Sequence, residues 1–132
     1  MLATAPAVAQ QTTAPAWPQP DSVWVPLFQE QVSRLMAAPG EERQDGAMQL
    51  ITQYATYTDA DGDPVFNFRS QVPSLLDVYR NEKDMGRRLL ALSALNAIGD
   101  RAAFRKLAEW MPEERSERVR RQTLYVLSAH QK

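Results

Sequence analysis

Apolar residues recur every three or four positions from residue 22 to the end of the chain, which is the spacing of helices that bury one face. The pattern predicts six helices, over residues 22–38, 41–54, 70–80, 81–98, 100–111 and 116–130. Ser70, Asn81, Asp100 and Ser116 are residue types that favour N-cap positions, and each stands where one of these helices begins. Helices in this order, joined by short connections, predict an all-α protein.

One longer segment, residues 57–69, interrupts the helical pattern with the Asp, Gly and Pro residues of a loop. We expect its Val65, Phe66 and Phe68 to pack against the helices, because three exposed apolar side chains so close together would be costly. The aspartates of residues 59–63 invite comparison with a calcium-binding loop. No register, however, puts both the glycine and the final glutamate of an EF-hand in place. We therefore favour a polar turn at residues 59–63.

Residues 1–20 differ from the rest in being rich in Ala, Pro, Thr and Gln, without a charged side chain. We predict a disordered tail here, because the segment offers too little apolar surface to offset the entropy lost on ordering. Ala7-Val8-Ala9 is similar to the small-residue cleavage site of a secretory signal. Only six residues precede it, so either the sequence begins inside the signal or the likeness is accidental. We expect a periplasmic or secreted protein, with a cytoplasmic one as the alternative.

The fourth and sixth predicted helices resemble each other at an offset of 32 residues. Residues 87–95, RRLLALSAL, align with residues 119–127, VRRQTLYVL. A repeat of this period with two helices in each unit is typical of helical solenoids. Asp84, Arg88 and the closing Ile98-Gly99-Asp100 match the outline of the second helix in the HEAT family, so the chain resembles a HEAT protein of the short bacterial type.

The resemblance implies a short α-solenoid of about three stacked antiparallel helix pairs, formed by residues 22–55, 70–98 and 101–130 of one domain, 21–132. It also implies a module without catalytic activity that binds another protein. In this family an arginine near the start of the second helix bonds an acid of a neighbouring unit. Arg88 and Arg120 would take that structural role, and the expected acceptors are Asp77, Asp84 or Asp100.

Composition narrows the chemistry that this chain of 132 residues can perform. It has no cysteine and one histidine, His130, which excludes disulfides, thiolate chemistry and a multi-histidine metal centre. We expect His130 to be a surface residue near a frayed helix end. No apolar run reaches the roughly 18 residues of a membrane-spanning helix. Since no nucleophile, base or metal set is assembled, we expect no enzymatic activity and no cofactor.

The net charge of −1 hides an uneven distribution, because residues 1–86 carry about −6 and residues 87–132 about +5. We favour an ordinary solvated helix face for the basic residues. The alternative is a surface that binds an anionic partner or nucleic acid, although the overall charge favours a protein partner over nucleic acid. The candidate basic face comprises Arg87, Arg105, Lys106, Arg115, Arg118 and Arg121.

Overall fold

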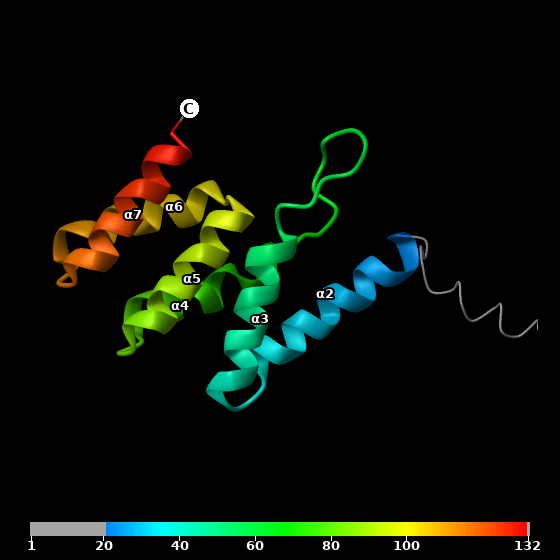
Figure 1. Cartoon of the computed structure of the whole chain (residues 1–132), viewed down its shortest axis with the longest axis horizontal. Coiled ribbons are helices and arrows are strands. Elements are labelled where there is room, and N and C mark those ends of the chain that lie inside the picture. Colours follow the sequence, from blue (N-terminus) through cyan, green and yellow to red (C-terminus); the bar gives the residue numbers. More distant parts are fainter. Residues whose placement is uncertain (1–20, 132) are drawn as a thin grey trace, which may run out of the picture.

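A computed structural model describes residues 21–131 of the chain (Figure 1). The predicted disordered tail and signal remnant, residues 1–20, lie outside the described residues. Six α-helices and no β-strand are present in the part described, which confirms the prediction of an all-α protein. The helices are α2 (Asp21–Ala37), α3 (Glu41–Tyr54), α4 (Val72–Asn81), α5 (Met85–Ile98), α6 (Arg101–Trp110) and α7 (Glu117–Ala129), with 3-10 turns η1 (Arg69–Gln71) and η2 (Met111–Glu113).

Side-chain caps fix where the later helices begin. Asp100 accepts a hydrogen bond from the Ala103 N–H at 3.0 Å and Ser116 accepts one from the Val119 N–H at 3.2 Å, so both predicted N-caps are confirmed. The predicted cap at Asn81 is wrong. Asn81 is the last residue of α4, and Asp84 caps α5 instead by accepting from the Arg87 N–H at 3.0 Å.

The predicted cap at Ser70 is also wrong. Ser70 lies inside the 3-10 turn η1, and α4 begins two residues later at Val72. Pro73 stands in the first turn of α4, where its missing N–H leaves no helical hydrogen bond unmade. Gly99 directly follows α5 and has a left-handed backbone (φ 71°). Glycine adopts this conformation without strain, and it lets the chain turn directly into α6.

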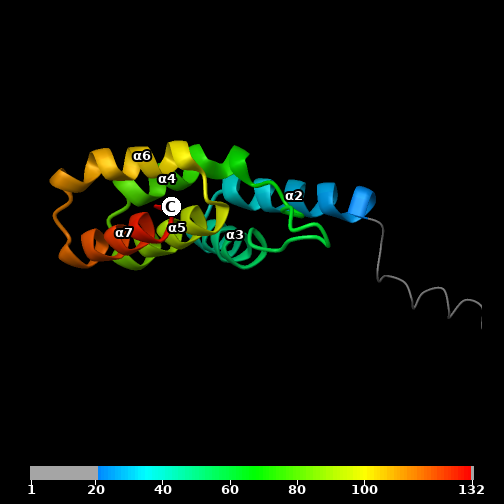
Figure 2. The same ribbon diagram turned by 90° about the horizontal axis from the view of Figure 1, so that it is seen from above.

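Consecutive helices form three hairpins, α2–α3, α4–α5 and α6–α7, whose members lie in two layers (Figure 2). Helices α2, α4 and α6 lie in one layer, and α3, α5 and α7 lie in the other. Within the second layer α5 packs against α3 on one side and against α7 on the other. Each hairpin therefore buries apolar surface both within itself and against its neighbour.

The core runs through all three hairpins. Ile51, Leu75, Leu95 and Leu107 are fully buried. At the junction of the second and third hairpins, the buried Tyr79 hydroxyl lies 2.7 Å from the hydroxyl of Thr123. The Thr123 hydroxyl donates to the Val119 carbonyl at 2.7 Å, so its single proton is used there and Tyr79 donates to Thr123.

The loop between the first two hairpins is anchored by aromatic side chains. Phe66 and Phe68 are buried, as predicted, and Val65 is half-buried. The Phe66 ring packs edge-on against Trp24 with ring centroids 5.3 Å apart, and Tyr54 contributes a further ring to the cluster, 5.8 Å from Phe66. Among residues 21–131 no helix combines the length and the apolar character that a bilayer crossing requires.

Candidate protein-binding surface

Arg87, which the sequence placed on an exposed basic face, is buried, with only 8% of its side chain exposed. Its Nε donates to Asp45 at 2.6 Å, and its two terminal nitrogens donate to Glu82 and Gln44. Glu41 adds a carboxylate oxygen 3.6 Å from the guanidinium. The prediction for Arg87 is corrected, because these acceptors from α3 and from the end of α4 draw it inward, where it joins the first hairpin to α5.

Arg88 and Arg120 make comparable bonds 32 residues apart. Arg88 Nε donates to the Tyr79 carbonyl at 2.6 Å, near the end of α4, and Arg120 donates to the Glu114 carbonyl at 2.6 Å, just after α6 and η2. Each arginine thus ties the second helix of a hairpin to the end of the first. Arg88 also forms a two-pronged ion pair with the Glu114 carboxylate, so the acceptor is Glu114 and the predicted choice of Asp77, Asp84 or Asp100 is wrong.

The ion pair between Arg88 and Glu114 shifts the titration of both groups. Hydrogen bonds from Arg88 hold the pKa of the Glu114 carboxyl below its ordinary value, although partial burial acts in the opposite direction. Glu114 raises the pKa of Arg88 in turn. The pair therefore remains ionised at neutral pH and links the second hairpin to the third.

The five other basic candidates are exposed. Arg105 lines a groove between α6 and α7, whereas Arg118 lines a different groove between α5 and α7. Arg121 pairs with Glu117 on the surface of α7 at 3.3 Å. Lys106 lies on α6 and Arg115 lies in the connection before α7. Neither residue lines these grooves.

The α6–α7 groove has a volume of about 510 Å³ and an apolar floor with two arginines of α6 beside it. Phe104 and Leu127 form part of the floor, and Arg101 and Arg105 stand one turn apart along its edge. His130 is exposed, as predicted, yet its Nε2 lies 2.7 Å from the Asn96 Oδ1. Its ring packs on the Phe104 ring, with the two ring centroids 4.5 Å apart. The lining residues are Arg101, Phe104, Arg105, Ala108, Leu127, His130 and Gln131.

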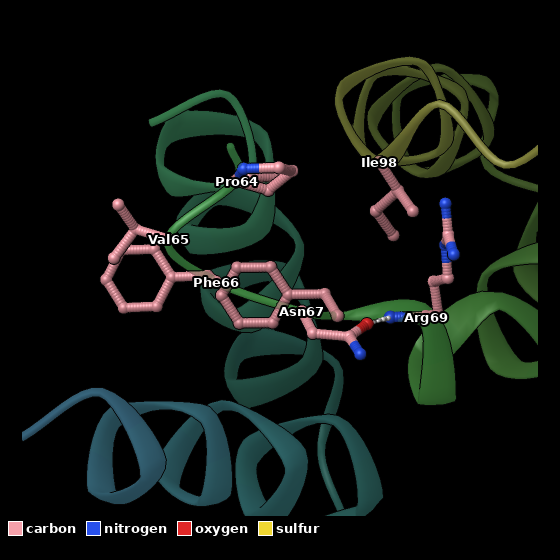
Figure 3. Close-up of a pocket in the computed structure, with 8 residues that line it drawn as sticks. Pro64, Val65, Phe66, Asn67, Arg69 and Ile98 are labelled. Atoms are coloured by element: carbon pink, nitrogen blue, oxygen red, sulfur yellow. Dashed lines mark hydrogen bonds between the residues drawn. The ribbon is translucent and has the colours of Figure 1, made fainter. Parts of the chain in front are cut away.

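Among the other hollows of the described surface are one between α5 and α7 and one beside the loop before η1. The α5–α7 groove, of about 350 Å³, is lined by Leu89, Leu92, Ser93, Asn96, Arg118, Gln122 and Val126. A cavity of about 380 Å³ separates the loop before η1 from the end of α5 (Figure 3). There Ile98 faces Pro64 across the opening, and the Asn67 side chain accepts from the Arg69 N–H at 3.0 Å. The Asn67 bond shapes the loop itself.

Asp59, Asp61 and Asp63 lie close enough for their carboxylate oxygens to come within 4.8 Å of one another. All three are exposed. One carboxylate oxygen of Asp59 accepts from the N–H groups of Asp61 and Asp63 at 2.8 and 3.0 Å, and these bonds close the turn. The geometry agrees with the polar turn favoured for this segment.

No family model matches the chain, and neither the curated proteins nor the solved structures include a significant match to it. The likeness to HEAT proteins therefore rests on the residues quoted from the sequence. The basic face predicted from the sequence includes Arg105 but none of the other residues that line the α6–α7 groove. The alignment of residues 87–95 with residues 119–127 could have drawn attention to Leu127, because it places Leu124 and Leu127 opposite Leu92 and Leu95.

Proposed function

We propose that this chain is a protein–protein interaction module of HEAT-repeat type without catalytic activity, built as a short α-solenoid of three stacked helix pairs. The observation that carries the proposal is the succession of hairpins in two layers, with α5 between α3 and α7. The bonds of Arg88 and Arg120 support it, since two arginines 32 residues apart each bond a backbone carbonyl near the end of the preceding helix.

Stacked helix pairs offer extended surface rather than an enclosed reaction site, which is why such folds serve to bind partners. The α5–α7 groove lies between the second and third hairpins, and the α6–α7 groove lies within the third. The net charge of −1 favours a protein partner over nucleic acid, whose binding needs a strongly basic surface. We propose further, from Ala7-Val8-Ala9, that the module acts in the periplasm or outside the cell.

Site-specific photo-crosslinking in cells tests the protein-binding function. A benzophenone amino acid is placed at Ser93 or Gln122 in the α5–α7 groove, or at Ala108 in the α6–α7 groove. The control position is Asp77, an exposed residue of α4 outside both grooves. We expect at least one groove position to form a reproducible crosslink to a defined protein, and Asp77 to form none.

Failure of all groove positions to crosslink would contradict the proposal. Cell fractionation with determination of the mature N-terminus tests the location separately, and an uncleaved N-terminus in the cytoplasm would contradict export. Retardation of DNA or RNA at physiological ionic strength would favour the alternative, nucleic-acid binding.

A further inference from the structure

The repeat places equivalent leucines in very different surroundings. Leu92 and Leu95 of α5 are 3% and 0% exposed. Thirty-two residues later, Leu124 and Leu127 occupy the same positions of α7, yet Leu124 is 51% exposed and Leu127 is half-buried. Helix α5 has α7 packed beside it, whereas no helix among residues 21–131 covers the corresponding side of α7. The outer side of the third hairpin thus leaves Leu124 uncovered by any helix of the described residues.

The internal interface shows what such a helix contributes. Helix α7 presents Val119, Thr123 and Val126 as its buried face, at the i, i+4, i+7 spacing of an amphipathic helix. The residues just before α7 bring the Glu114 carboxylate to Arg88. Arg120, the equivalent of Arg88 in the repeat, is half-buried and has no carboxylate oxygen within 4.0 Å among the described residues.

Charge on the α6–α7 groove points to the same kind of occupant. Arg101 and Arg105 stand beside the apolar floor, and no acidic residue of the described chain lines the groove. Neither guanidinium forms an ion pair within residues 21–131. An apolar floor edged by unpaired arginines complements a helix that carries apolar residues on one face and carboxylates at its margin.

We propose that the α6–α7 groove, together with Leu124, is the docking site for an acidic amphipathic helix of a partner protein. This inference rests on the proposed protein-binding function and specifies both the surface and the chemistry of the partner. A second copy of the chain docked through the same surface is disfavoured, because it would bring the Arg101 and Arg105 side chains of two molecules together.

The test uses the full chain and a labelled peptide designed on the internal template. The probe is a fluorescein-labelled peptide of residues 112–130 that carries the changes R115E, R118E and R121E, so that it keeps the apolar face of α7 and becomes acidic. The control is the peptide of native sequence. By fluorescence anisotropy at low salt, we expect the acidic peptide to bind at least about tenfold more tightly, with the difference shrinking at high salt, where charges are screened.

Variants of the protein locate the peptide. Arg101→Glu and Arg105→Glu should each weaken binding of the acidic peptide about tenfold, and Leu124→Ala about threefold to tenfold, because each removes one part of the docking surface. Arg43→Glu is the matched control, since Arg43 is an exposed arginine of α3 outside the groove, and its effect should stay within about twofold. Circular dichroism of each variant shows whether it remains folded.

Three outcomes would overturn the inference: no binding of the acidic peptide, equal loss in Arg43→Glu and Arg101→Glu, or a dimer in sedimentation that Arg105→Glu abolishes. If the peptide fails while Ser93 or Gln122 crosslinks a partner in cells, the inference is wrong and the proposed function stands. If neither the peptide nor any crosslink is found, the proposed function fails as well.

Discussion

The ion pair of Arg88 and Glu114 is the strongest charged link between the second and third hairpins, so its removal tests how they are joined. The Arg88 side chain is 14% exposed and the Glu114 side chain 9%. Arg88→Met would leave the Glu114 carboxylate poorly hydrated and without its cation, and it would also remove the bond to the Tyr79 carbonyl. Removing one partner of a buried ion pair costs about 3–5 kcal/mol, and we expect the free energy of unfolding to fall by that amount.

Glu114→Gln should lower the free energy of unfolding less than Arg88→Met does. Arg88 keeps its hydrogen bond to the Tyr79 carbonyl, and its Cζ stays over the Tyr79 ring, 5.3 Å from the ring centroid. We expect a loss of about 1.5–3 kcal/mol, typical of a hydrogen bond to a charged group. The double variant should lose less than the sum of the two, by a coupling energy of about 0.5–3 kcal/mol, because no unpaired carboxylate remains.

Urea unfolding followed by circular dichroism measures all four free energies of the cycle. Arg34→Met is the matched control, since Arg34 and Glu30 form a surface pair whose side chains are 71% and 58% exposed, and its loss should stay below about 1 kcal/mol. Additive losses in the cycle, or a loss in Arg88→Met no larger than that of Arg34→Met, would refute the conclusion that this pair joins the hairpins.

Three further predictions concern the packing, the backbone and the pH dependence of stability. Leu92→Ala should lower the free energy of unfolding in urea by about 2–5 kcal/mol, and Leu124→Ala, at the aligned position, by less than about 1 kcal/mol. The reason is that Leu92 is 3% exposed and Leu124 51%, so equal losses would contradict the burial. Gly99→Ala should lower thermal stability by about 1–2 kcal/mol because the φ of Gly99 is +71°, and a stabilising effect would contradict the left-handed turn. Gly46→Ala should raise stability by about 0.5–1 kcal/mol, because Gly46 lies in a helix with open space around it. Because Arg88 lowers the pKa of Glu114, the stability difference between wild type and Glu114→Gln should be complete at neutral pH and shrink as pH falls through the lowered pKa; a difference that grows in acid would contradict this sign.

Local patterns predicted the helices well because helix formation and capping depend on residues close in sequence. Asp100 and Ser116 cap the helices expected of them, since each needs only a backbone N–H three residues ahead. The start of α5 was predicted wrongly because Asn81 and Asp84 are both good caps. Asn81 instead bonds back to Asp77 within α4 at 2.7 Å, and Asp84 caps α5.

The candidate surface was predicted less well because it depends on contacts distant in sequence. Nothing in the local sequence separates Arg87 from the exposed arginines of the predicted basic face, and its burial follows from acceptors such as Asp45, 42 residues away. Helical spacing likewise identifies Leu124 as apolar but does not say whether another helix covers it. Only the three-dimensional arrangement distinguishes the covered side of the third hairpin from the open one.

Nuclear Overhauser effects of Tyr79 test most directly whether the third hairpin packs on the second with its Thr123 side inward and its Leu124 side open. The two hydroxyls of Tyr79 and Thr123 lie 2.7 Å apart although the residues are 44 positions apart in sequence. We predict contacts in solution between the Tyr79 ring protons and the Thr123 methyl group, and none between Tyr79 and Leu124. A folded protein without the Thr123 contact, or with a Leu124 contact in its place, would contradict both the stacking and the open docking surface.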